Sequence, residues 1–236
     1  MKVRTMKTCL GTSVGVCCMW VAAIASAANR TWDGGGSDAN WRTPANWDGN
    51  VTCPSMGDAL FFGGLAWLSN VNDFSTGTAF SGLTFNAGAG AFTLAGNAIT
   101  LDGDISNLLA NAQTIDLPLI LSDVRTVYGV DKQVTLNGTL SGPGGLTAAI
   151  TNGTLKLTGD NTYEGFTTIA DKCRVEITHG NALGSLLAGT LVDGDALGIL
   201  RFSGSVEIEE PITLKSVLPG YAPSLISGSG TNVLKG

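Results

Sequence analysis

The feature that most constrains the fold is a short apolar-polar-apolar triplet that recurs along most of the chain. Alternation with period two is typical of a strand that buries one of its faces. Ten such triplets occur, at residues 83–85, 92–94, 99–101, 115–117, 134–136, 155–157, 175–177, 200–202, 206–208 and 212–214. No stretch shows a convincing amphipathic helical period, so the sequence predicts an all-β protein.

The spacing of these triplets predicts how the strands are connected. Leu157 follows Leu136 by twenty-one positions, and Phe202 follows Leu157 by forty-five, close to two such steps. A glycine two residues after many triplets, such as Gly138 and Gly159, permits a corner with positive φ. Equal units that each turn a corner predict a parallel β-solenoid, and the general chirality of parallel crossovers favours a right-handed one.

The N-terminus has the pattern of a secretory signal peptide. An apolar run over residues 9–24 follows three basic residues and ends in the small-residue sequence Ala25-Ser26-Ala27. We expect residues 1–27 to be removed by cleavage between Ala27 and Ala28. The mature chain is then expected at the cell surface, associated with the outer membrane, or outside the cell, with no membrane span of its own.

The charge of the mature chain excludes two classes of partner. Loss of Lys2, Arg4 and Lys7 from the 13 basic residues leaves 10 against 19 acidic residues, a net charge of −9. Nucleic acids and anionic lipids bind dense arrays of lysine and arginine, so neither is expected as a partner.

Residues 28–64 form a distinct entry segment that is rich in tryptophan, glycine and aspartate. Trp32, Trp41 and Trp47 lie within sixteen residues. A solenoid exposes its core at its ends, so the favoured interpretation is a hydrophobic cap. The alternative is a row of rings that stack on sugar faces, which would make the three tryptophans carbohydrate-binding residues.

Residues 65–236 are expected to form the solenoid itself. The sequence Ile226-Ser-Gly-Ser-Gly230 begins a second copy of Leu140-Ser-Gly-Pro-Gly144, and the chain then stops at Gly236. An uncapped last turn would leave strand edges and core exposed. We therefore expect the C-terminal end to be truncated or to be covered by further repeats or by a partner.

One stretch carries a family likeness. The sequence Gly153-Thr-Leu-Lys-Leu-Thr-Gly-Asp-Asn-Thr-Tyr-Glu-Gly-Phe-Thr-Thr-Ile169 resembles the autotransporter-associated β-strand repeat, and the likeness extends over about residues 140–185. It departs from the family pattern at Phe166, where glycine is usual, and at residues 171–174. The resemblance implies an exported β-helical passenger at the bacterial surface, and it does not imply an enzyme.

Three residues of this stretch are predicted to build a structural corner. An asparagine side chain can bond nearby backbone and tolerates left-handed geometry, so Asn161 is expected to turn the chain. Tyr163 is expected to pack on that corner, and Gly165 completes it.

The chain offers few groups for catalysis or metal binding. His179 is the single histidine and lies in a turn, while Cys53 and Cys173 are far apart in the sequence and are expected to be unpaired thiols. One histidine and two distant cysteines cannot form a zinc site, so we expect no catalytic residue, metal or cofactor.

Acidic residues leave one alternative open. Asp123 follows Asp102 by twenty-one positions, so a turn of that length would stack the two on one face, where they could form an acidic groove. Aspartate is common in turns, which favours a structural role for both.

The leading hypothesis is an exported, non-enzymatic structural or adhesive β-solenoid, with surface glycans or other cell-surface proteins as partners. The alternative is a carbohydrate-binding or polysaccharide-degrading β-helix protein.

Overall fold

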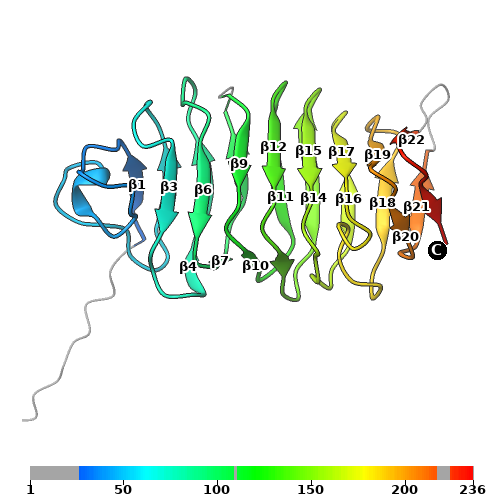
Figure 1. Cartoon of the computed structure of the whole chain (residues 1–236), viewed down its shortest axis with the longest axis horizontal. Helices are drawn as coiled ribbons and strands as arrows, with labels where there is room; N and C mark the ends of the chain where they lie inside the picture. The colour runs from blue at the N-terminus through cyan, green and yellow to red at the C-terminus, as the bar shows by residue number, and fades with distance from the viewer. Residues whose placement is uncertain (1–26, 109–110, 217–223, 236) are drawn as a thin grey trace, which may run out of the picture.

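The protein is an elongated parallel β-solenoid, as the strand pattern predicts. A computed structural model describes residues 27–108, 111–216 and 224–235, and in it successive turns follow one another along the long axis (Figure 1). Every strand pairing in these ranges is parallel, apart from one isolated antiparallel bridge between Trp32 and Trp47. The predicted fold class is confirmed, whereas the predicted signal peptide lies, up to residue 26, outside the described residues.

Two long sheets form two sides of the solenoid. Sheet A contains, in spatial order, β1 (Asn29–Trp32), β2 (Ala59–Phe62), β5 (Leu83–Phe85), β8 (Ile105–Asn107), β11 (Arg125–Val130), β14 (Leu146–Thr151), β16 (Thr167–Ile169), β18 (Thr190–Asp193) and β21 (Ile212–Lys215). Sheet B contains β3 (Ser69–Asn72), β6 (Thr93–Gly96), β9 (Gln113–Ile115), β12 (Gln133–Leu136), β15 (Thr154–Leu157), β17 (Arg174–Ile177), β19 (Ile199–Ser203) and β22 (Ser224–Ser229).

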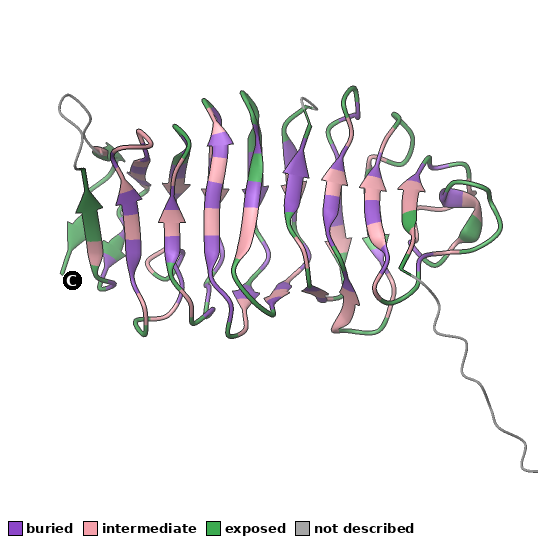
Figure 2. Ribbon diagram, turned by 180° about the vertical axis from the view of Figure 1, so that it is seen from behind, coloured by how far each residue is buried: buried purple, intermediate pink, exposed green. Residues whose placement is uncertain are grey.

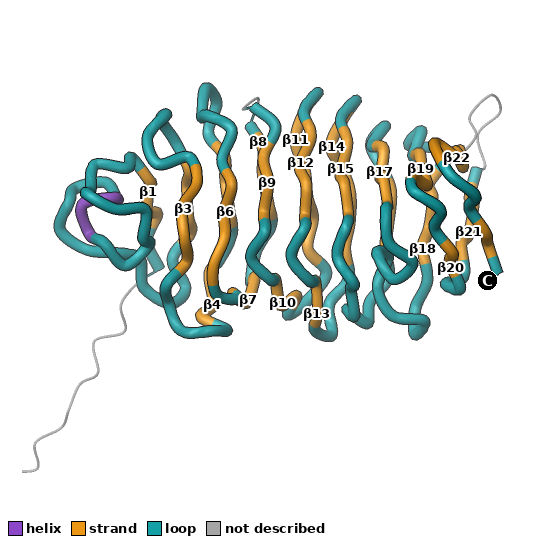
Figure 3. The backbone as a smooth tube through the Cα atoms, viewed as in Figure 1, coloured by secondary structure: helices purple, strands orange, loops and turns teal. Residues whose placement is uncertain are grey.

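The third side is a sheet only in its first half. Sheet C contains β4 (Thr78–Phe80), β7 (Ile99–Leu101), β10 (Leu119–Leu121) and β13 (Leu140–Ser141). The next turns cross this side as loops (Figure 3), and near the C-terminal end β20 (Glu207–Ile208) pairs with β23 (Val233–Leu234). The only helix in the described residues is a short 3-10 turn, η1 (Pro44–Asn46), and none is long and apolar enough to cross a membrane.

The turns are less equal than the sequence spacing suggested. In the middle of sheet A, Arg125 pairs with Leu146 and Leu146 with Thr167, so the step of twenty-one positions repeats there. Elsewhere the step changes: it is twenty between Ile99 and Leu119 in sheet C, and twenty-five between Arg174 and Ile199 in sheet B. The corners accommodate most of the extra residues, so most strands stay in register while the loops differ in length. The exception is the pairing of β19 with β22, where the register shifts between Phe202 and Ser203.

The core is a stack of apolar columns that run along the axis. On the inner face of sheet B, Leu94, Ile115, Leu136, Leu157, Ile177 and Phe202 follow one another from turn to turn, none more than 3% exposed. Their outward neighbours are mostly polar, and Figure 2 shows the same alternation of buried and less buried residues along the strands that face the viewer. Because each column is continuous, every turn buries its apolar residues against the turns on both sides.

Glycine serves the corners in two different ways. Gly96 and Gly142 have φ of 106° and 101°, as expected for a corner that favours glycine. Gly159 has no such φ, and a Cβ there would lie only 2.9 Å from the carbonyl oxygen of Gly138 in the preceding turn. At this second kind of position glycine is required because two backbones stack closely, not because the chain turns left-handed.

The two ends of the described solenoid differ. At the N-terminal end three tryptophans are fully buried, whereas β21, β22 and β23 at the other end are mostly exposed (Figure 2). Leu214 and Leu234 are each 48% exposed.

Cys53 and Cys173 are both free thiols, as predicted.

The stacking requirement gives a first prediction. A Cβ at Gly165 would lie 2.6 Å from the backbone nitrogen of Gly145, with no flexible side chain to yield, so Gly165→Ala is expected to destabilise the fold by about 2–4 kcal/mol. Gly63→Ala is the matched control, since its nearest neighbour would be 3.6 Å away. Urea unfolding of both variants checks this, and equal stabilities would contradict it.

Candidate functional site

The tryptophans of the entry segment form a closed cluster. Trp32, Trp41 and Trp47 are each 0% exposed, with ring centroids 5.3 Å apart for Trp32 and Trp47 and 6.2 Å for Trp41 and Trp47, both edge to face. Phe62 and Phe80 complete the cluster against the first turns. A ring without exposed surface cannot stack on a sugar, so the burial supports the cap and not the carbohydrate platform.

Each indole nitrogen of the cap has a defined acceptor. Trp47 Nε1 donates to the carbonyl oxygen of Trp41 over 2.7 Å, and Trp41 Nε1 donates to Asn70 Oδ1 over 2.7 Å. Trp32 Nε1 donates to the carbonyl of Ala66 over 3.3 Å. With their polar atoms satisfied, the three side chains can be fully buried at little cost.

The two candidate acids of the groove hypothesis do not stack on each other. Leu101 pairs with Leu121, because this turn is one residue shorter than the step between the two acids, so Asp102 lies opposite Ser122. Asp102 Oδ1 accepts a hydrogen bond from Ser122 Oγ over 2.8 Å, while Asp123 accepts one from the backbone of Val124 over 2.7 Å. Both acids are exposed turn residues, and the expected register between them was wrong by one position.

The corner predicted at Asn161 joins three successive turns. Its Oδ1 accepts a hydrogen bond from the backbone N–H of Leu140 over 2.8 Å, and its Nδ2 donates to the carbonyl oxygen of Ala182 over 2.7 Å. One partner lies a full turn before Asn161 and the other a full turn after it, and Asn161 is only 2% exposed. On the side where sheet C ends, this amide side chain adds to the backbone hydrogen bonds that still join the turns, such as the bond from the Thr162 N–H to the carbonyl oxygen of Leu140 over 2.8 Å.

Tyr163 packs inside the same corner. It is 0% exposed, and its hydroxyl shares a hydrogen bond with Thr167 Oγ1, which donates to the carbonyl oxygen of Leu183 over 2.9 Å. Burial raises the pKa of the Tyr163 hydroxyl. Its ring lies against Gly184, where a Cβ would be 2.8 Å from Tyr163 Cε2. This buried tyrosine is a structural residue with no access to a ligand.

A second prediction concerns Asn161. Asn161→Ala removes both of its bonds and leaves the buried N–H of Leu140 and carbonyl of Ala182 without partners, which should cost about 2–4 kcal/mol. Hydrogen exchange should show the Leu140 amide losing protection, because its acceptor is lost. Asn137→Ala is the control, since that amide bonds only exposed side chains. Unchanged protection at Leu140 would refute the bridging role.

Glu210 is an unusual buried acid close to this corner. It is 4% exposed, and Thr190 Oγ1 donates a hydrogen bond of 2.9 Å to its Oε1. Burial raises the pKa of its carboxyl to about 7, and the bond from Thr190 offsets part of that effect. Because the folded state prefers the protonated acid, this contribution to stability is complete below the ordinary pKa of 4.5 and is lost as the pH rises through about 7.

A third prediction follows from Glu210. The melting temperature of the native protein should fall between pH 5 and pH 8, and Glu210→Gln should reduce that fall, because a neutral amide has no charge to bury. The exposed neighbour Glu209 supplies the control variant Glu209→Gln. Thermal scans at both pH values test this, and an equal decrease in all three proteins would contradict it.

The best candidate for a ligand site is a groove along the corner between sheets A and B. Four residues that follow successive strands of sheet A, Asp131, Asn152, Lys172 and Leu197, have left-handed φ of 58°, 55°, 58° and 56°. Stacked tightly, they turn the chain sharply towards sheet B. We call the hollowed surface beside this column the corner groove.

The corner groove consists of three adjoining hollows. The first, about 520 Å³, is mostly apolar and is lined by Ala87, Asn107, Leu108, Tyr128, Gly129, Val130, Ala149, Thr151 and Asp171. The second, about 320 Å³, shares Thr151 and Asp171 and adds Lys172, Asp195, Ala196 and Leu197. The third, about 370 Å³, shares Lys172 and Leu197 and reaches Asn152, Gly153, Arg174 and Ile199. Shared walls make the hollows one continuous surface.

The groove offers apolar surface at one end and charge at the other. Tyr128 is 41% exposed and lies on the outer face of sheet A. Asn107 pairs with Gly129 in the neighbouring turn and is 0% exposed, so its side chain offers no atom to a ligand. At the other end Lys172 and Arg174 are exposed and, within the described part of the chain, form no ion pair. An exposed aromatic ring and two cations suit a long ligand with apolar and polar sides.

The sequence did not reveal this groove. Tyr128 lies two turns before Lys172 and Arg174, so their place along one groove depends on the register between strands. The only local signal was the set of polar residues after successive strands, Asp131, Asn152 and Asp171, which are ordinary turn residues when each is taken alone.

Two other reactive side chains, Cys173 and His179, have defined surroundings. Burial raises the pKa of the Cys173 thiol to about 11, which keeps it protonated. His179 Nδ1 accepts a hydrogen bond from the backbone of Asn181 in an exposed turn. Among the described residues no three His, Cys, Asp or Glu side chains gather where they could hold a metal ion.

The chain matches no protein-family model, no curated protein and no solved structure. The likeness of residues 153–169 to the autotransporter-associated repeat therefore stays a prediction, while the parallel β-solenoid that it implied is present in the structure.

Proposed function

We propose that the protein is an exported, non-enzymatic β-solenoid that serves at the cell surface as a structural or adhesive element, with the corner groove as its contact surface. The observation that carries the adhesive part is the continuous groove over successive turns of a rigid stack. The signal pattern supports export, and Ala28, the residue after the expected cleavage point, is hydrogen-bonded to Asp58 and Ala59.

A glycan chain is the ligand that the groove suits best. The first hollow is lined from five consecutive turns, and at about 4.8 Å per turn these extend roughly 20 Å along the axis. A sugar has an apolar face that can stack on Tyr128 and polar edges that can bond Thr151 and the charged residues beyond. Surface glycans are therefore the proposed partners, and binding to a cell-surface protein is the competing outcome.

Export is tested on the full chain with its own leader in a bacterial host. We expect mass spectrometry to show a mature N-terminus at Ala28, and protease added to intact cells to remove the protein. A chain retained inside the cell with Met1 in place would overturn the proposal of export.

A fourth prediction tests the groove. If residues 28–236 bind members of a glycan array, Tyr128→Ala should weaken that binding about tenfold, because stacking on one aromatic ring contributes about 1–1.5 kcal/mol. Phe166→Ala is the matched control, since Phe166 is 63% exposed but lies outside the corner groove. Equal loss in both variants, or none in Tyr128→Ala, would remove the groove as the site.

One observation favours a second function, the hydrolysis of a polysaccharide. Asp171 and Asp195 line the middle hollow together, and a pair of carboxylates in a groove is the arrangement that polysaccharide hydrolysis needs. A depolymerisation assay on the bound glycans distinguishes the two functions. Turnover that disappears in Asp171→Asn or Asp195→Asn would replace the adhesive proposal with an enzymatic one.

A further inference from the structure

We infer that cleavage between Ala27 and Ala28 creates an ammonium group that forms an ion pair with the buried carboxylate of Asp58, so that the N-terminal cap is complete only in the processed chain. The reaction is hydrolysis by a signal peptidase: water adds across the peptide bond, Ala27 keeps the carboxylate, and the freed amine of Ala28 takes up a proton. This inference rests on the proposed export only for the origin of the free N-terminus.

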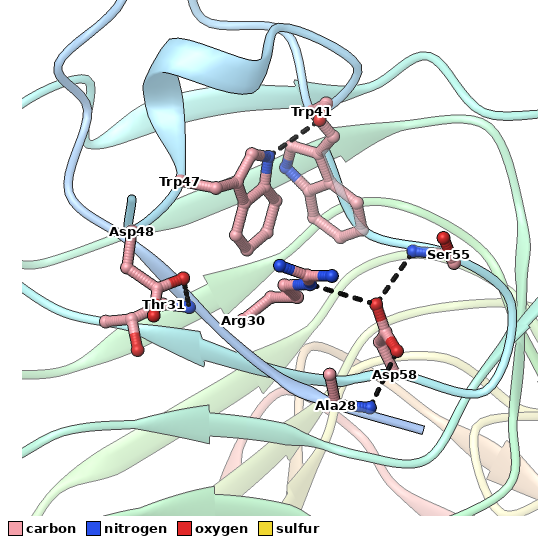
Figure 4. A network of polar contacts seen from close by, with 8 residues as sticks. All are labelled: Ala28, Arg30, Thr31, Trp41, Trp47, Asp48, Ser55 and Asp58. Carbon is pink, nitrogen blue, oxygen red and sulfur yellow. Dashed lines mark hydrogen bonds and ion pairs between the residues drawn. The ribbon is translucent and has the colours of Figure 1, made fainter. Parts of the chain in front are cut away.

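The geometry around Asp58 is already that of a cation site. Asp58 is 2% exposed, and its Oδ1 accepts a hydrogen bond from the Ala28 nitrogen over 2.8 Å (Figure 4). Its Oδ2 accepts bonds from Arg30 Nε over 3.2 Å and from the backbone N–H of Ser55 over 2.9 Å. In the unprocessed chain the Ala28 donor is a neutral amide, and cleavage turns that same atom into a charged donor.

The register fixes the position of the new terminus. Asn29 pairs with Ala59, and the backbone N–H of Ala59 donates to the carbonyl oxygen of Ala28 over 2.9 Å. The Ala28 nitrogen is therefore held beside Asp58 by the first pair of strands. Cleavage one residue later would remove this donor, and cleavage one residue earlier would leave it a neutral amide.

Of the charges near this nitrogen, the Asp58 carboxylate favours the ammonium form and the Arg30 cation opposes it in part. Asp58 contacts it directly, and Arg30 occupies the other carboxylate oxygen. A charge-assisted bond to a buried carboxylate is stronger than a bond from a neutral amide. The extra interaction joins β1, which carries Trp32, to the loop before β2, and so it strengthens the attachment of the tryptophan cap.

The fifth prediction compares two forms of the mature chain. Residues 28–236 are released in vitro with a free Ala28 amine by a site-specific protease, and one portion is N-acetylated at Ala28. The free form should melt about 2–4 °C higher at pH 7.

Its α-amino pKa, measured by NMR, should lie above the ordinary value of about 7.7–8.0, because the neighbouring carboxylate favours the ammonium. The stabilisation is then present below about pH 7.7 and is lost as the pH rises through the higher folded value.

Two variants show whether Asp58 is the partner. Asp58→Asn should abolish the difference between the free and acetylated forms. Asp48→Asn should preserve it, because Asp48 Oδ1 accepts a bond from the backbone of Thr31 on the same strand but contacts no terminus (Figure 4). If Asp58→Asn does not fold, the inference is tested by the α-amino pKa and by the effect of acetylation on the melting temperature, both measured in the native sequence. An ordinary pKa together with equal melting temperatures would overturn the inference, whatever the result of the export experiment.

Discussion

The structure depends on one constraint: each turn must offer its backbone groups to the turns on both sides at a single strand spacing. Within a strand the parallel ladder satisfies this automatically, so the difficulty lies at the corners. The chain meets it in three ways. Glycines such as Gly159 let two backbones stack closely, left-handed residues such as Asn152 turn the chain within one position, and Asn161 bonds the turns before and after it. Where sheet C ends, the bonds of Asn161 add to the backbone hydrogen bonds that still join the turns.

The same constraint shapes the outer surface. A tight left-handed corner recurs at Asp131, Asn152 and Lys172 along one edge of the solenoid, and the corner groove lies beside it. The opposite edge of sheet A has longer loops, with the exposed Phe166 and Leu187. A potential contact surface thus arises from the way the chain turns, and the side chains placed there, Tyr128 above all, set what it can bind.

The features that recur in every turn could be predicted from the sequence, and the predictions failed where one turn differs in length from the others. Period-two triplets and regular glycines sufficed for an all-β parallel solenoid. Asn161 has no left-handed φ, contrary to the geometry expected for it, and its side chain bonds the neighbouring turns and not its own backbone. The pairing of Asp102 and Asp123 failed because one turn is a residue shorter than the average, which no local pattern reveals. The tryptophans could be a cap or a sugar platform until burial distinguished them, because both uses need the same residue type. The groove depends on register across several turns and could not be found from sequence alone.

Two buried carboxylates show how differently the ends are held. Asp58, under the tryptophan cap, accepts three hydrogen bonds, one of them from an arginine, so its charge is compensated where it lies. Glu210, near the other end, has a threonine hydroxyl as its donor, and burial therefore favours its neutral form. In a stack whose turns interact only with their neighbours, such differences stay local. The turns around Glu210 are therefore expected to lose stability as the pH rises through about 7.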